Sequence, residues 1–211
     1  MGQLVIRASW LLATGLLAPL CVVSGCFGRE TYRWQEEVLL HDGRVLVIDR
    51  SVLTGAVPVE IGQRPGESDY TLKLKSSDGT TVTWDGGRDR FVPIILDFVD
   101  GVPYVGAIGA TGLVYPREGC PRPPYFFFRW SAGEWTRIPY EDFPKVVRNA
   151  NLTSSLTYRA PYRERIARGD LITREDVHEL LRMANPEAKM VREDAPNPCA
   201  NWNDDFRYMP M

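Results

Sequence analysis

The sequence predicts a mainly β protein, an antiparallel meander of about eight strands arranged as a sandwich or barrel-like sheet, with a C-terminal α-helix. Four stretches consist of two apolar or alternating segments around a Gly-containing turn, which is typical of β-hairpins. Gly and Pro number 18 and 16 among 211 residues, which favours many turns over long helices. One later stretch has the periodicity of an amphipathic helix.

The four predicted hairpins span 34–50, 71–84, 91–108 and 125–138. The first three turn at Asp-Gly, a pair that accommodates the positive φ angles of a tight hairpin. The arms of the third are nearly apolar throughout, so we expect central strands that are covered on both faces. Pro93 and Pro103 should then lie at strand starts, bulges or edges, because proline cannot donate a ladder hydrogen bond.

The chain changes character after 144. Residues 145–157 have no clear period, and a short helix and an extended crossing both fit them. The stretch Pro161–Arg168 predicts a short helix that ends at Gly169. Thr173–Ala184 predicts the main helix, with Thr173 as N-cap and acidic residues in the first turn. The domain organisation that follows is an antiparallel β domain over 26–144 and, packed on it, a helical appendage and Pro-rich tail over 145–211.

The N-terminus has the anatomy of a signal segment. Arg7 supplies a positive charge, 8–23 is mostly apolar, and Val23-Ser24-Gly25-Cys26 follows. The tetrapeptide resembles the lipobox of bacterial lipoproteins. An ordinary signal peptide cut elsewhere and an uncleaved membrane anchor are the alternatives, but the apolar stretch is shorter than the roughly 20 residues that spanning needs.

The resemblance implies removal of residues 1–25, acylation of Cys26 (palmitate among the acyl chains) and a membrane partner reached through this lipid anchor. Phe27 follows the cysteine where an Asp would favour the inner membrane, so the resemblance implies the outer membrane, facing the periplasm. In such an oxidising compartment an isolated cysteine pair usually bonds, and we expect a Cys120–Cys199 disulfide rather than two free thiols.

Few residues in the sequence indicate a catalytic, metal-binding or cofactor-binding site. The chain has two histidines. His41 lies in a predicted turn beside Asp42, where adjacent residues rarely point together, and we expect His178 on the exposed side of its helix. Neighbouring carboxylates, such as Glu36-Glu37, do not supply the spacing that a glycosidase needs. We therefore assign no catalytic residue, no metal ligand and no cofactor.

The strongest apolar feature of the sequence is the aromatic run 125–128, followed by Trp130 and Trp135. We expect it to be a core strand covered on both sides; the alternative is an exposed partner surface, since exposed aromatic patches usually mark contacts. A basic stretch over 159–174 is typical of a solvated helix face. The alternative is a surface that binds anionic lipid, lipopolysaccharide or an acidic partner. The residues of this possible partner surface are Tyr125, Phe127, Trp130, Trp135, Arg159 and Arg163.

The function predicted from these features is a binding or structural role in the cell envelope, with an envelope protein or glycan as partner. The alternatives are an envelope hydrolase acting on glycan or peptide bonds and an inhibitor or immunity-type lipoprotein. A net charge of −2 gives no indication of a nucleic-acid partner, which would call for a strongly basic domain.

Overall fold

The structure is a computed structural model that describes residues 29–54, 67–76, 78–88, 90–154, 156–184 and 188–200. Its eight strands are β1 (Glu30–Leu39), β2 (Val45–Thr54), β3 (Glu67–Lys75), β4 (Thr81–Asp85), β5 (Phe91–Val99), β6 (Val102–Gly109), β7 (Phe126–Ser131) and β8 (Glu134–Ile138). Its helices are α1 (Val114–Arg117), α2 (Ala160–Arg168) and α3 (Arg174–Arg182), with 3₁₀ turns at Tyr140–Asp142 and Leu156–Tyr158. The predicted mainly β fold with C-terminal helices is confirmed.

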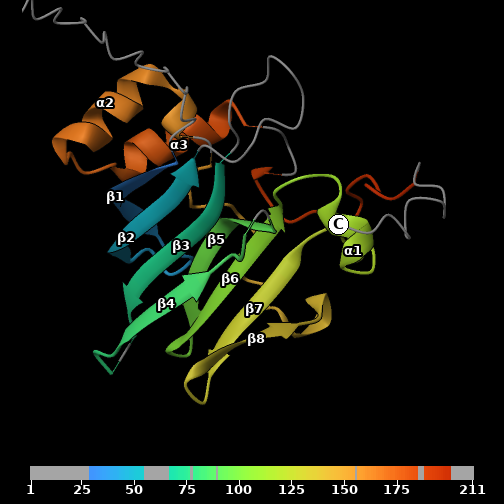
Figure 1. Ribbon diagram of the computed structural model, residues 1–211. Coiled ribbons are helices and arrows are strands. Elements are labelled where there is room, and N and C mark those ends of the chain that lie inside the picture. The colour runs from blue at the N-terminus through green and yellow to red at the C-terminus, as the bar shows by residue number, and fades with distance from the viewer. Residues whose placement is uncertain are drawn as a thin grey trace, which may run out of the picture.

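The strands form two four-stranded antiparallel sheets in sequence order, β1-β2-β3-β4 and β5-β6-β7-β8 (Figure 1). All four predicted hairpins are present. Across the described residues no strand pairing closes the two sheets into a barrel, and the arrangement is that of a β-sandwich. A shared core of apolar side chains joins the sheets, and in it Trp84 of β4 lies edge-on to Phe128 of β7 at 5.5 Å between ring centroids.

Two of the tight turns show why their residues suit a hairpin. Asp100 and Gly101 have φ angles of 52° and 77°, and Ala132 and Gly133 have 52° and 88°. Two successive positive φ angles match the right-handed twist of the flanking strands. The Asp-Gly pair between β5 and β6 therefore connects these strands with two residues.

Strand β5 is covered on both faces, since its first eight residues are buried. It is nevertheless an edge strand and not a central one, because β6 is its one partner in the sheet. Pro93 lies at a register shift of this edge strand, which agrees with the predicted bulge or edge position. Asn151 covers the open edge: its Oδ1 accepts from Leu96 N at 3.0 Å, and its Nδ2 donates to the carbonyls of Leu96 and Leu39.

The edge of β1 is covered by the chain that enters α3. Ile172 N donates to Gln35 O and Glu37 N donates to Ile172 O, at 3.0 and 2.9 Å. Thr173 then caps α3, as predicted: its side chain accepts from Asp176 N, and the Asp176 carboxylate accepts from Thr173 N. This reciprocal capping box satisfies two backbone donors and places α3 at one end of the first sheet (Figure 1).

The predicted disulfide is present. Cys120 and Cys199 are bonded with a Cα–Cα distance of 6.1 Å and a sequence separation of 79 residues. The bond attaches the C-terminal segment to the loop after α1. Within the described part of the chain, no helix has the length and apolar character needed to cross a bilayer.

Candidate functional site

A wide hollow lies between α3, the segment 146–151 and the end of β1, and we call it the α3 groove. Its volume is about 880 Å³, which is within the range of about 300–1,000 Å³ that small-molecule sites occupy. Both histidines of the chain line it. The sequence did not indicate that the two histidines line one groove, because His41 and His178 lie on elements that are far apart along the chain.

His41 is held by a buried carboxylate on the other sheet. Its Nδ1 lies 2.7 Å from Asp97 Oδ1, and its backbone N–H donates to Asp97 Oδ2 at 2.9 Å. The Asp97 side chain is 3% exposed and that of His41 is 27% exposed, so the carboxylate orients an imidazole that still reaches solvent. Asp42, the sequence neighbour, pairs with Arg44 instead.

One face of α3 forms a wall of the groove. Arg174, His178 and Arg182 lie four residues apart, and this spacing places them in one row along the helix. Arg174 is paired with Glu175 at 2.8 Å. Within the described residues, neither the His178 imidazole nor the Arg182 guanidinium has a side-chain partner.

The opposite wall combines cations with apolar side chains. Arg148 donates from Nε to the carbonyl of Lys145, and Lys189 Nζ donates to the carbonyl of Arg182. Leu39 and Val146 are 45% and 63% exposed, so their apolar surface is open to the groove. The groove thus has an apolar surface beside basic groups.

A buried ion pair holds the segment that forms one wall of the groove. Arg50 Nη1 lies 2.9 Å from Glu36 Oε2, and both side chains are fully buried. Thr153 donates to Glu36 from both N and Oγ1, at 2.8 Å each, and Arg50 Nη1 donates to Thr153 O at 2.7 Å. Trp34 Nε1 also donates to Glu36, and the guanidinium lies over the Trp34 ring. Because Thr153 follows Asn151 closely, this cluster fixes the segment that forms a wall of the groove.

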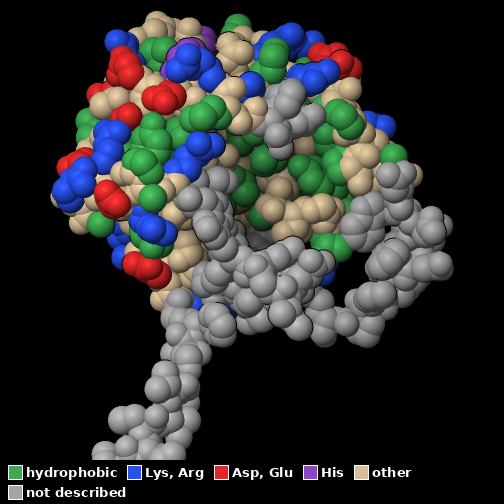
Figure 2. All heavy atoms as spheres, turned by 90° about the horizontal axis from the view of Figure 1, so that it is seen from above, with side chains coloured by type: hydrophobic (Ala, Val, Ile, Leu, Met, Phe, Trp, Pro, Cys, Tyr) green, Lys and Arg blue, Asp and Glu red, His purple; other side chains and the backbone are tan. Residues whose placement is uncertain are grey.

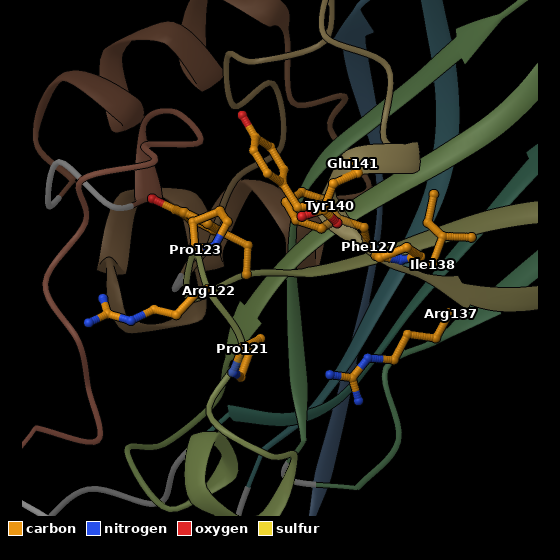
Figure 3. A pocket seen from close by; sticks show the side chains of 10 residues that line it. Pro121, Arg122, Pro123, Phe127, Arg137, Ile138, Tyr140 and Glu141 are labelled. Carbon is orange, nitrogen blue, oxygen red and sulfur yellow. The ribbon is translucent and has the colours of Figure 1, made fainter.

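A second, smaller hollow of about 390 Å³ lies between the loop 121–123 and β8 (Figure 3). Arg137 at its edge is already paired with Glu118 at 2.8 Å. Tyr140 donates to Glu193 at 2.8 Å, and its pKa is raised by burial first and then by this hydrogen bond. With these polar groups satisfied inside the protein, the hollow is the weaker candidate for a ligand.

The possible aromatic partner surface is not present as one surface. Tyr125 and Phe127 are each 2% exposed, because they pack in a second core cluster with Phe143, Val147 and Val191, and they line the second hollow. Trp130 and Trp135 are partly exposed and pack on each other at 5.5 Å. Arg159 and Arg163 lie at the opposite end of the molecule from the β7–β8 turn (Figure 1). The core-strand expectation therefore holds for Tyr125 and Phe127.

The basic stretch around α2 is largely neutralised by its own neighbours. Arg165 is bound by the Asp176 carboxylate through two hydrogen bonds, and Arg168 pairs with Asp170 at 2.7 Å. Acidic side chains lie among the basic ones on this end of the molecule (Figure 2). The arrangement is that of a solvated, mixed-charge helix face.

Of the remaining predicted positions, Cys26 lies outside the described residues. Among the described residues, no group of three or more His, Cys, Asp or Glu side chains is placed to hold a metal ion. No protein-family profile, curated protein or solved structure matches the chain.

Proposed function

We propose that this chain is a lipid-anchored protein of the bacterial cell envelope that binds an envelope component through the α3 groove. The observation that carries the location is the Val23-Ser24-Gly25-Cys26 tetrapeptide after a short apolar stretch. The Cys120–Cys199 disulfide supports it, since such bonds persist in oxidising compartments. Acylation with two or more chains would make attachment stable, whereas one chain binds only marginally.

The binding role rests on the α3 groove. It combines a volume suited to a small ligand with exposed apolar side chains and basic groups that have no carboxylate partner within the described residues. Concave sites with an apolar lining and a few polar groups are the usual form of ligand sites.

Metabolic labelling with an alkyne palmitate and intact-mass measurement test the anchor. Cys26→Ala should remove the label and release the protein from membranes or leave it unprocessed. Cys21→Ala is the matched control, because it removes a cysteine of the same N-terminal stretch and should leave labelling unchanged. An unmodified mature mass for the wild type, or labelling that survives Cys26→Ala, would refute the anchor.

A second candidate, an envelope hydrolase, is favoured by the His41–Asp97 pair. A carboxylate at Nδ1 orients an imidazole so that Nε2 can accept a proton from water or substrate. His41 Nε2 has no hydrogen-bond partner within the described residues. Hydrolysis of an envelope glycan or peptide that His41→Asn abolishes would establish this activity, and turnover by His41→Asn equal to that of the wild type would reject it.

A further inference from the structure

We propose that the α3 groove binds a single-chain anionic amphiphile, a small molecule with a carboxylate or phosphate headgroup on an apolar chain. The inference rests on the proposed binding role of the groove and names its ligand class. It follows from the division of the groove into a cationic part and an apolar part.

The cationic part is formed by side chains that converge from three segments. Arg148, Arg182 and Lys189 line the groove together with Arg174, whereas the carboxylates that line it are Glu37, Asp97 and Glu175. These three carboxylates are all engaged. Asp97 binds His41, Glu175 pairs with Arg174, and Glu37 accepts from Arg174 N at 3.1 Å.

Two guanidinium groups therefore remain for a ligand. Arg148 uses Nε on a backbone carbonyl, and Arg182 makes no side-chain hydrogen bond within the described residues; neither has a carboxylate partner there. A guanidinium binds carboxylate and phosphate through paired N–H donors, which makes an anionic headgroup the natural complement. The chain as a whole carries a net charge of −2, so this local excess of free donors is not a general property of its surface.

The apolar part is formed by Leu39, Val146 and Leu181. Leu39 and Val146 are about half exposed or more, although removing such apolar surface from water is favourable. Leu181 is partly buried and packs against both core clusters. An alkyl chain lying on these residues would remove their exposed surface from water, while its headgroup reaches the guanidinium groups.

The size of the groove suits a small ligand. The volume of about 880 Å³ exceeds that of a single short alkyl chain with its headgroup and lies within the small-molecule range. Both histidines line the same groove: His178 lies between Arg174 and Arg182 on α3, and His41 lies in the turn after β1.

The two histidines offer a specific measurement. Because the chain contains no others, selective ¹³C-histidine labelling of the untagged full chain, held in phosphatidylcholine nanodiscs, gives two imidazole signals that both report on the groove. Octanoate and octyl phosphate should shift these signals saturably. Octyl glucoside, which has the same tail without charge, and acetate, which has the charge without the tail, should bind at least ten-fold more weakly.

Arg148→Gln combined with Arg182→Gln should weaken octanoate binding at least ten-fold. Arg129→Gln combined with Arg117→Gln is the matched control, because it removes the same charge from exposed positions away from the groove and should leave the affinity unchanged. Equal shifts with octyl glucoside, no saturable shift with octanoate, or equal affinity of the two double variants would overturn the proposal. The result does not depend on Cys26, so a failure of the anchor and a failure of the ligand class are separate outcomes.

Discussion

Glu36 of β1 and Arg50 of β2 form an ion pair of 2.9 Å between two side chains that have no exposed surface. They lie on the inner face of the first sheet, where Glu36 pairs in register with Ile48 and Arg50 with Trp34. The Glu36 carboxylate also accepts from Thr153 and Trp34, whereas Arg50 Nε and Nη2 have no hydrogen-bond partner among the residues that the structure describes. The pair thus connects the sheet to the segment beside the α3 groove.

Glu36→Gln should destabilise the fold by about 3–5 kcal/mol, because it leaves the Arg50 cation buried without a counter-charge. Urea unfolding at neutral pH measures this loss. Glu37→Gln is the control, since its side chain lies on the other face of the same strand, and it should cost far less. Similar losses for the two variants would contradict the assignment of a buried charge pair.

Asp97→Asn should lower the free energy of unfolding by about 1–3 kcal/mol, because the amide cannot accept all the hydrogen bonds that the carboxylate accepts in this buried position. Those bonds come from Phe98 N and from the backbone and ring of His41. The ¹³C-histidine spectrum should show a shift of the His41 signal and little change at His178. Asp42→Asn is the matched control, and a larger effect on the His41 signal from Asp42→Asn than from Asp97→Asn would identify the wrong carboxylate.

Removal of the disulfide by Cys120→Ala with Cys199→Ala should cost about 4 kcal/mol, the chain-entropy value for a loop of this length. The separation of 79 residues is the basis of this figure. The midpoint of thermal unfolding measures the loss, and the wild type in reducing buffer should approach the double variant. A double variant as stable as the oxidised wild type would show that the disulfide contributes little to the stability of the fold.

Asp176 predicts a pH-dependent contribution to stability. Its pKa is lowered, first by the hydrogen bonds from Arg165 and then by those from Thr173, with burial acting in the opposite direction. A lowered pKa in the folded state means that the stabilisation is present above the ordinary Asp pKa of about 3.9 and is lost as pH falls through the folded value.

Asp176→Asn should therefore cost about 1 kcal/mol at pH 7, as for a lost helix cap. The difference from the wild type should shrink below pH 3 in urea unfolding. Glu179→Gln removes an equal charge from an exposed position of the same helix and should show no such pH dependence. A constant difference between Asp176→Asn and the wild type from pH 7 to pH 2.5 would reject this interpretation.

The local structure follows from the amino-acid sequence. Gly-containing turns set the four hairpins, because positive φ angles are confined to few residue types, and Thr173 with its acidic first turn set the start of α3. The inward alternation of Trp34, Glu36 and Val38, together with the turn at Asp42-Gly43, also carried the register that brings Glu36 near Arg50. The pairing of Glu36 with Arg50 could therefore have been predicted from the sequence. It was not, because charged residue types usually indicate side chains that are exposed to solvent.

Contacts between residues that are far apart in the sequence depend on how the sheets and helices pack. Asp97 reaches His41 across 56 positions, and His178 joins them because Ile172 pairs with the edge of β1 and so aligns α3 beside it. Hairpin patterns specify neighbours within a sheet, but not how one sheet packs on another or where an appended helix is placed. The segments that follow β8 also bury Tyr125 and Phe127, which pack with Phe143, Val147 and Val191 on the face of the second sheet away from the first. A strand's exposure depends on what covers its second face, and the hairpin pattern does not specify this.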